Sequence, residues 1–553
     1  MFYAAGGVSS VEIKRTGNSG IITATLHVFI ALLVAFGVRA YLWLVFPHVI
    51  FLHEADAIAY IGIARNIIEN FSISNAIHFP PFYPALIALS SLVAGNYESG
   101  ARWASILAGA GMVVPLYLAC RQLMSSRAAF CAVLLAAGFD QFVDYSLQPI
   151  TQASYGALIA LGVWLGLRCI GKSAPALLAA FGLTSAAIYL TRPEGILFFA
   201  FNFPLLVYAI CKDTGELKGR LKRILVLSAG FLIPFFWYVS FLKQSTGHWS
   251  LSGKSGVTSI GVDASLKLLP GGLTYGEAVA GTAGISNLFP GIAAFIKTYL
   301  TQLGKFALVA YSVVPVLVFL LAVAGMALLV SEVLRRERGA RLKALCSLVL
   351  FLSPLIMLAP VMVFDKISVT PGYILPFFMV VLCCCAKGIA WLESLLGEKI
   401  KKPACIPAVL KKNISLAILA SLLLSWYLFL PVYQRISSDE FQFMGAQQDF
   451  LLRQTGHWFL HNTDKSAKLM SRWSNIGYYG ERGWIALADG SIGEVIAYAK
   501  RNGITHIVID SDSVPRRRPQ LLNLLDPSIP HAGLTPVYAD ERFYTRVVIY
   551  QVK

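Results

Sequence analysis

The stretch IITATLHVFIALLVAFGVRAYLWLVF, residues 21–46, decides the class of fold. A helix that crosses the hydrocarbon core of a bilayer needs about 20 mostly apolar residues, and this stretch is long enough. It is too long for the apolar core of a cleaved signal peptide, which has about 7–15 residues. We therefore expect residues 21–46 to be a first membrane anchor.

The composition of the whole chain is that of a membrane protein. Of 553 residues, 57% are hydrophobic and only 14% are charged, whereas soluble domains carry about 25% charged residues. A net charge of +17 would suggest nucleic acid as the partner of a soluble protein. Here the basic residues lie in short loops between apolar runs, which membrane topology explains without nucleic acid. The nine cysteines lie mostly within apolar runs, and their spacing predicts neither a metal site nor a disulfide framework.

The apolar runs predict a mostly α-helical, polytopic bundle of about eleven transmembrane helices. These spans lie near residues 21–46, 101–120, 128–147, 150–167, 174–191, 193–211, 224–242, 306–330, 345–364, 370–391 and 413–431. Two shorter segments, 82–94 and 288–303, are expected to lie at the outer interface. Counting 82–94 as a span would invert every later loop and break the charge bias of those loops.

That charge bias sets the expected orientation. With the N-terminus in the cytoplasm, the segments on the inner side carry 22 lysines and arginines, and the outer loops that precede the last span carry nine. Short cytoplasmic loops of membrane proteins are enriched in lysine and arginine. We therefore expect the segments 47–100 and 243–305, and the end of the chain, to lie outside the cytoplasm.

Residues 436–553 are expected to form a small soluble α/β domain after the membrane domain of residues 1–435. Ile492–Asn502 has helical periodicity and is followed by Gly503, a residue that commonly ends helices. Ile504–Ile509 is typical of a buried strand, and Val547–Val552 alternates as a final strand does.

The first outer loop holds the richest group of candidate catalytic residues. Glu54 and Asp56 directly follow the first span, and Tyr60 lies one helical turn after Asp56. Carboxylates at a membrane surface suit a general base that accepts a proton from a hydroxyl group. The alternative is an exposed helix start, where acidic residues favour the helix dipole.

Two further segments on the outer side carry polar residues. In residues 75–84, three prolines fix an extended turn after His78, which is either a functional residue or a solvated loop histidine. Arg192 and Glu194 interrupt apolar sequence between the fifth and sixth spans; Arg192 suits a phosphate, and a mutual salt bridge is the alternative. Asp140 and Asp144 lie four residues apart at the outer end of the third span, either as a shared acidic face or as solvated helix ends.

These segments resemble the GT-C membrane glycosyltransferases, which use lipid-phosphate sugars and include protein O-mannosyltransferases and the lipid A aminoarabinose transferase. The similarity is to the bacterial branch and covers mainly residues 20–240. The shared motifs are Asp56, Tyr60, Ala64 and Arg65; Pro80, Pro81, Tyr83 and Pro84; and Leu190–Gly195. The C-terminal stretch also looks like the outer domain of that branch.

The resemblance implies a reaction and a set of roles. Asp56, aided by Glu54, would deprotonate an acceptor hydroxyl that attacks the anomeric carbon with inversion, and Arg192 and Arg65 would bind the donor phosphate. Supporting residues would be Tyr60, His78, Tyr83, Asp144 and Glu194. The chain departs from the family where His78-Phe79 replaces an acidic and a basic residue, and where Thr151-Gln152 replaces Thr-Glu. Glu54, Asp144 and Glu194 are therefore all candidates for a second acidic group.

The partners implied are a polyprenyl-phosphate sugar donor and an envelope glycan, lipid or protein acceptor, in a bacterial inner membrane with the C-terminal domain outside the cytoplasm. No cofactor is assigned beyond the lipid-linked sugar donor, which is a substrate, and a role for a divalent metal stays open. The competing hypotheses are a transporter or flippase of a lipid-linked saccharide and a non-enzymatic envelope scaffold. A transporter favours polar residues at the bilayer midplane and inverted repeats, and the sequence has neither.

Overall fold

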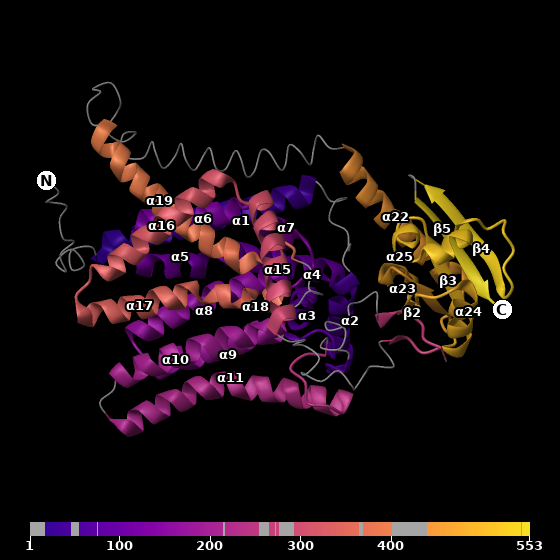
Figure 1. Cartoon of the computed structure of the whole chain (residues 1–553), viewed down its shortest axis with the longest axis horizontal. Coiled ribbons are helices and arrows are strands. Elements are labelled where there is room, and N and C mark those ends of the chain that lie inside the picture. The colour runs from indigo at the N-terminus through magenta and orange to yellow at the C-terminus, as the bar shows by residue number, and fades with distance from the viewer. Residues whose placement is uncertain are drawn as a thin grey trace.

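The structure is a computed structural model that describes residues 17–45, 55–74, 76–213, 216–253, 265–270, 272–275, 292–363, 369–400, 439–542 and 545–553. A bundle of long helices fills one part of the molecule, and a smaller domain with a β-sheet lies at one end of the bundle (Figure 1).

The bundle consists of apolar helices. They are α1 (Gly17–Val45), α4 (Tyr97–Gly111), α5 (Val113–Leu123), α6 (Ser126–Gly138), α7 (Asp140–Leu147), α8 (Gln152–Gly171), α9 (Pro175–Thr191), α10 (Ile196–Asp213), α11 (Leu217–Thr246), α16 (Val316–Leu334), α17 (Arg338–Leu352), α18 (Ala359–Val363) and α19 (Leu375–Ile400). Short 3₁₀ turns, η2 (Pro193–Gly195) and η4 (Ser353–Leu358), join consecutive helices.

Among the described residues, eight helical segments are long and apolar enough to cross a membrane, and the pair α6–α7, bent by 50°, makes a ninth. These nine correspond to nine of the predicted spans. The predicted span 174–191 is α9, an apolar helix of 17 residues, and 413–431 lies outside the described residues. The chain is therefore a multi-pass membrane protein.

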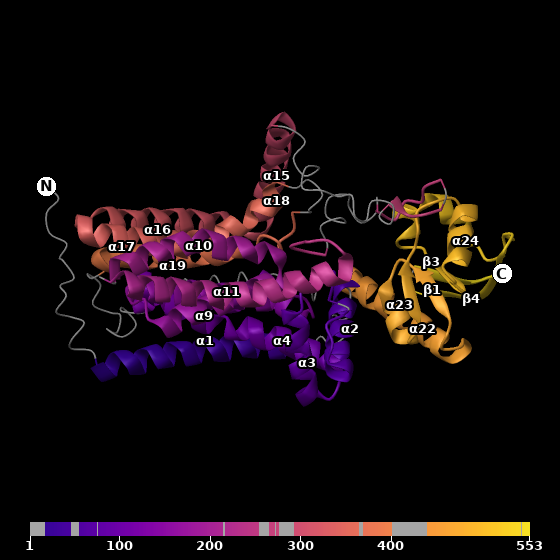
Figure 2. The same cartoon turned by 90° about the horizontal axis from the view of Figure 1, so that it is seen from below.

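The prediction that residues 306–330 form one span is wrong at its N-terminal end. The structure ends α15 (Ile292–Val313) two residues before Pro315 and starts α16 after it. Proline disfavours helical conformation in the residue before it, so one continuous helix is not formed here. The segment 288–303, predicted as a separate interfacial helix, is described only from residue 292, where it is the first half of α15 (Figure 2).

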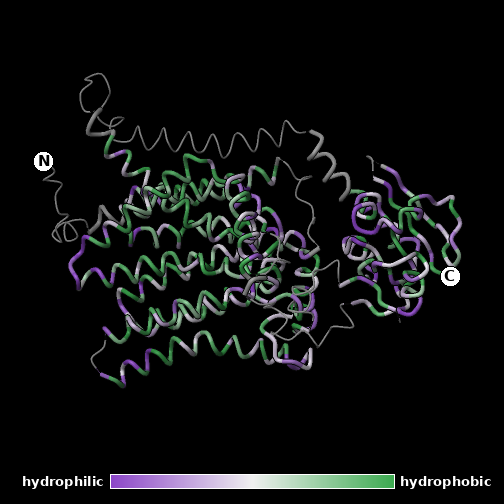
Figure 3. The backbone as a smooth tube through the Cα atoms, in the orientation of Figure 1, coloured by the Kyte–Doolittle hydropathy of each residue, from purple (hydrophilic) through white to green (hydrophobic). Residues whose placement is uncertain are grey.

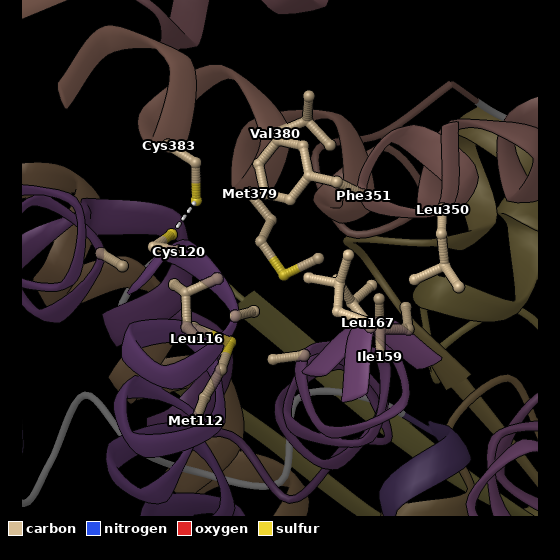
Figure 4. Packing of buried hydrophobic residues seen from close by; sticks show 14 of the residues in the cluster. Met112, Leu116, Cys120, Ile159, Leu167, Leu350, Phe351, Met379, Val380 and Cys383 are labelled. Carbon is tan, nitrogen blue, oxygen red and sulfur yellow. Dashed lines mark hydrogen bonds between the residues drawn. The ribbon is translucent and has the colours of Figure 1, made fainter. Parts of the chain in front are cut away.

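Small residues allow the helices to approach closely, as is common in membrane bundles. A Cβ atom added at Gly325 would lie 1.9 Å from the Cys384 carbonyl oxygen, and one at Gly388 would lie 2.1 Å from that of Leu321. Buried sulfur groups fill the adjacent core, where Cys120 and Cys383 lie 3.5 Å apart at Sγ (Figure 4). The described cysteines are free thiols, and all but Cys211 are buried, so they pack as small hydrophobic side chains.

A fully buried arginine holds the break between α6 and α7. Arg39, on α1, donates from Nη1 to the Ala137 carbonyl at 3.1 Å and from Nη2 to the Phe142 carbonyl at 3.1 Å. Carbonyl groups at the end of a helix have no partner within that helix. The Ala137 carbonyl, at the end of α6, is one of these and receives a donor from Arg39, and the Phe142 carbonyl of α7 receives a second one. These bonds explain how a charge is accommodated inside a membrane span.

The bundle has two chemically different ends, and hydrophilic residues concentrate at both (Figure 3). One end brings together the loops predicted to be cytoplasmic: a cavity there is lined by Gln122, Gly171, Arg336 and Lys343. The other end carries α2 (Ala55–Asn70) and α3 (Phe82–Ala94), beside the C-terminal domain (Figures 1 and 2). The grouping of loops by parity of the spans agrees with this arrangement.

The C-terminal domain contains a five-stranded sheet in the order β2-β1-β3-β5-β4. The strands are β1 (Lys468–Ser471), β2 (Gly483–Ala486), β3 (His506–Asp510), β4 (Leu534–Arg542) and β5 (Thr545–Val552). The helices are α22 (Asp439–Asn462), α23 (Ser474–Gly480), α24 (Ile492–Arg501) and α25 (Val514–Arg517), with the 3₁₀ helix η6 (Pro519–Leu525). β1, β2 and β3 are parallel, and β5 is antiparallel to both of its neighbours.

The predicted helix and both predicted strands of this domain are confirmed. Ser491 and Glu494 form a capping box at the start of α24. Gly503 follows the helix with φ +65°, a conformation that favours glycine. Capping at one end and glycine at the other fix the length of α24.

Candidate active site

Helix α2 presents Asp56 and Tyr60 at the bundle end that adjoins the C-terminal domain. Asp56 lies in the first turn of α2, and Tyr60 lies four residues later, on the same face. Ala57, Tyr60, Ile61 and Ala64 bury this helix against α3 and α4. The apolar packing fixes α2, and the position of Asp56 follows from it.

Aromatic rings hold the Tyr60 side chain. Its ring is edge-on to Phe79 at 4.8 Å and to Tyr83 at 5.2 Å between centroids. The Tyr83 hydroxyl is hydrogen-bonded to Ser105 at 2.7 Å and donates to the Ala101 carbonyl at 3.3 Å. Tyr83, predicted as a supporting residue, thus lies behind Tyr60 and braces it against α4.

Arg192 lies at the turn between α9 and α10. Its backbone is extended (φ −148°), and Pro193–Gly195 then forms a single 3₁₀ turn. A Cβ atom at Gly195 would lie 2.6 Å from backbone atoms of Ile188 and Tyr189, so the turn requires glycine at this point. The sequence Arg-Pro-Glu-Gly therefore folds back tightly on the end of α9.

Arg192 and Glu194 form an ion pair, the alternative left open for these two residues. Arg192 Nε donates to Glu194 Oε1 at 2.6 Å, and the side chains are only 11% and 19% exposed. The arginine carbon Cζ lies 4.6 Å from the Tyr373 ring centroid and 5.4 Å from that of Tyr155. The bond to Glu194 uses the Nε hydrogen, and the other guanidinium donors are on the two Nη atoms.

The charges of Asp56 and Arg192 both act on the hydroxyl group of Tyr60. The pKa of Tyr60 is raised well above its usual value, first by burial and then by the negative charge of Asp56, while Arg192 and a hydrogen bond with Thr151 act in the opposite direction. A carboxylate and a guanidinium thus both act on one buried phenol.

The other residues around Arg192 come from segments that are remote in sequence. Gly372 packs so closely that an added Cβ atom would lie 3.0 Å from Gln152 Nε2 and 3.1 Å from the Tyr145 ring. Thr151 donates to Gln152 Oε1 at 3.4 Å. The loop before α19 therefore closes over the start of α8 and brings Tyr373 to Arg192.

Other predicted residues have contacts with their own neighbours. Arg65, with its side chain 47% exposed, lies 3.9 Å from Glu69 and 5.4 Å from the Tyr97 ring centroid. His78 Nδ1 lies 3.2 Å from the Gly253 carbonyl oxygen. Asp144 accepts a hydrogen bond from Gln148 at 3.1 Å. Glu54 lies outside the described residues.

The C-terminal domain contacts the same end of the bundle. Tyr478 and Tyr479 of α23 pack against the cluster that buries Tyr60. Arg453 of α22 lies 3.5 Å from Glu98 of α4 and donates to the Tyr479 hydroxyl at 3.1 Å. The domain is therefore attached beside α2.

Sequence reasoning missed Tyr155 and Tyr373 as partners of Arg192. Tyr155 carries a weak signal, since it follows Thr151 by one helical turn. Tyr373 carries none, because about 180 residues of chain separate it from Arg192. Within the described residues, no group of three or more His, Cys, Asp and Glu side chains is arranged to hold a metal ion.

Comparison with known proteins identifies the fold. Residues 78–239 match the family model of dolichyl-phosphate-mannose-protein mannosyltransferases. No curated protein gives a significant match to the sequence.

Solved structures are similar over most of the chain. The apo oligosaccharyltransferase of Archaeoglobus fulgidus has a TM-score of 0.52 at 13% identity over 89% of this chain and 70% of its own. The same enzyme, AglB, in complex with an inhibitory peptide and a dolichol-phosphate gives 0.50 at 14% identity over 89% and 69%. ArnT from Cupriavidus metallidurans bound to undecaprenyl phosphate gives 0.50 at 13% identity over 97% and 98%.

The chain has the GT-C fold. The expected resemblance to GT-C membrane glycosyltransferases is thereby confirmed. The match to ArnT extends over nearly the whole chain, so the C-terminal domain is included in the similarity.

Proposed function

We propose that the protein is a glycosyltransferase that moves a sugar from a polyprenyl-phosphate donor to an acceptor hydroxyl on the extracytoplasmic side of a bacterial inner membrane. The observation that carries the proposal is a carboxylate in the first turn of α2, Asp56, at the same bundle end as the largely buried Arg192–Glu194 pair, with both Asp56 and Arg192 acting on the buried Tyr60. The family match over residues 78–239 supports sugar transfer. Two relatives of the same fold were solved with a dolichol-phosphate and with undecaprenyl phosphate, which supports the donor class.

In the proposed reaction, the acceptor oxygen attacks the anomeric carbon while Asp56 accepts the hydroxyl proton. The bond between the anomeric carbon and the phosphate oxygen breaks, and its electron pair leaves with the lipid phosphate. Attack opposite to the leaving group inverts the anomeric configuration. Arg192 stabilises the charge that develops on the phosphate, since preorganised donors act best on charge that appears in the transition state.

The other residues have positioning roles in this proposal. Tyr60, whose pKa is raised so that it stays neutral, supplies a hydroxyl on which the charges of Asp56 and Arg192 both act. Glu194 and the rings of Tyr155 and Tyr373 orient the guanidinium. Arg65 lies against Glu69 and Tyr97, so the proposal assigns the phosphate to Arg192. Glu54 and Asp144 remain candidates for the second acidic group.

The test is the variant Asp56→Asn. Envelope glycans of cells that produce the parent or the variant are compared by mass spectrometry, with membrane levels of both proteins measured. The proposal expects the sugar modification to disappear while membrane insertion is normal. Glu69→Gln, at the opposite end of the same helix and half-exposed, is the matched control and should keep the modification. Modification by the Asp56→Asn protein at the parental level would refute the role of Asp56.

A further inference from the structure

A polar cavity in the C-terminal domain lies apart from the proposed catalytic residues. Its volume is about 590 Å³. The segments that line it follow three strands: Arg472 and Trp473 come after β1, Asp489 comes after β2, and Asp512–Arg518 comes after β3. The cavity is thus at the carboxyl ends of the three parallel strands.

The topology of the sheet marks the same place. The chain goes from β1 to β2 on one side of β1, and α24 then carries it to β3 on the other side. The order therefore reverses between β1 and β3, which pair at Leu469↔His506 and Met470↔Ile507. Open α/β sheets bind ligands in the crevice at such a switch point, because the two connections diverge to opposite faces of the sheet.

The loop after β3 is built around a buried carboxylate. Asp510, the last residue of β3, is 2% exposed. It accepts hydrogen bonds of 2.6 Å from both the backbone N–H and the hydroxyl of Ser513. These bonds fix the turn that leads into the arginines, so their placement at the cavity is determined by the domain core.

The charge of the lining favours a phosphate group. Arg472, Arg516, Arg517 and Arg518 line the cavity, against two aspartates. Asp512 forms an ion pair with Arg516, and Asp489 lies 3.9 Å from Arg518. By formal charge the lining thus holds four arginines and two aspartates, a net positive charge that matches a phosphate dianion better than a single carboxylate. Arginine forks also fit phosphate oxygens geometrically.

Trp473 and the aspartates add the features of a sugar site. An indole offers an apolar face to the C–H groups of a pyranose ring, and carboxylates accept hydrogen bonds from sugar hydroxyls. We propose that this cavity binds a phosphorylated sugar, with the phosphate among the arginines and the ring against Trp473. Helices α23 and α25, which adjoin the cavity, lie on the side of the domain that faces the bundle (Figure 1). The site goes beyond the proposed function and involves neither Asp56 nor Arg192.

The test measures binding of α-D-glucose 1-phosphate to the full chain in phosphatidylcholine nanodiscs by titration calorimetry. Arg516→Gln and Arg472→Gln should each weaken binding about tenfold, the effect of one lost charge-assisted hydrogen bond. Arg516 is 70% exposed, so its substitution leaves the fold intact. Lys465→Gln, an exposed charge of the same domain outside the cavity, is the control and should bind as the parent does. Inorganic phosphate should bind more weakly than the sugar phosphate, and glucose should not bind.

Several results would overturn the inference. They are failure of the parent to bind glucose 1-phosphate, parental affinity in both cavity variants, and equal affinity for inorganic phosphate. Loss of binding in Arg192→Lys with full binding in the cavity variants would place the phosphate in the membrane domain instead. None of these results bears on whether Asp56→Asn abolishes sugar transfer, so the two proposals fail separately.

A second arm identifies the source of the phosphosugar. Nanodiscs with phosphatidylinositol 4-phosphate are compared with nanodiscs that carry an equal charge of phosphatidylglycerol. Weaker apparent binding of glucose 1-phosphate in the former shows that a membrane-anchored, phosphorylated ring polyol reaches the cavity and assigns the cavity to a lipid-linked ligand. Equal binding in both assigns it to a water-soluble one.

Discussion

Replacing Arg192 by lysine tests the proposed phosphate contact with little change to the fold. Lysine keeps the positive charge beside Glu194, so the ion pair and membrane insertion should persist. It removes the planar fork and its stacking on Tyr155 and Tyr373. The substitution therefore separates the charge of residue 192 from its geometry.

The expected loss of activity follows from the contacts that the Arg192 side chain makes. Loss of stacking costs about 0.5–1 kcal/mol, but it affects the protein with and without donor and so lowers stability rather than activity. Loss of one charge-assisted hydrogen bond to the phosphate costs about 1.5–3 kcal/mol. With about 1.4 kcal/mol for each tenfold change, kcat/KM for the donor should fall roughly 10- to 100-fold.

The assay is transfer by purified protein in nanodiscs with a lipid-phosphate sugar that supports turnover by the parent. Thermal unfolding of the same samples should show only a small decrease in Tm for Arg192→Lys. Parental kcat/KM in this variant would refute the phosphate contact. A fall in Tm large enough to explain the lost activity would show that residue 192 acts through the fold.

Glu194→Gln is the companion variant. The glutamine amide would keep an acceptor for Arg192 but remove the charge that compensates it, at a cost of about 1–3 kcal/mol of stability, below that of breaking a fully buried pair. Because the phosphate no longer competes with a carboxylate for the guanidinium, the KM for the donor should not rise. Complete loss of transfer in a folded Glu194→Gln protein would contradict the positioning role and identify Glu194 as the second acidic group.

Three further predictions concern stability and pH. Arg39→Met leaves the carbonyl groups at the α6–α7 break without its donors, and we expect a loss of about 2–4 kcal/mol, measured as a lower Tm in detergent. Arg453→Ala removes the contact with Glu98 at the domain junction; it should cost about 1 kcal/mol and speed hydrogen–deuterium exchange in α23. Burial raises the pKa of the Asp510 carboxyl above the value of 3.8 for the unfolded chain. Its protonation therefore stabilises the fold, and this stability is lost as the pH rises through the raised pKa. The parent should gain Tm relative to Asp510→Asn as the pH is lowered from 7 toward 4; a constant difference would contradict this.

The sequence predicted the membrane helices well because lipid imposes a simple rule on length and polarity. It failed at the junction of α15 and α16, although Pro315 carried the signal for the break. Near the proposed site, Asp56 and Arg192 were identifiable, since charge in apolar sequence is costly and therefore conspicuous. Tyr373 was not, because its position depends on how closely Gly372 packs against Gln152, which is a property of the folded bundle.

Two buried arginines show what sequence cannot separate. Arg39 and Arg192 both interrupt apolar sequence, and the free-energy cost of placing a charge there marks both as candidates for function. Their partners differ: Arg39 donates to backbone carbonyls of α1, α6 and α7, and so completes the fold. Arg192 is paired with a carboxylate and stacked on two rings at the end of the bundle, near Asp56. The groups that contact a buried charge, rather than its burial, therefore decide whether the charge serves structure or chemistry. This reasoning expects Arg39→Met to lower stability and Arg192→Lys to lower activity.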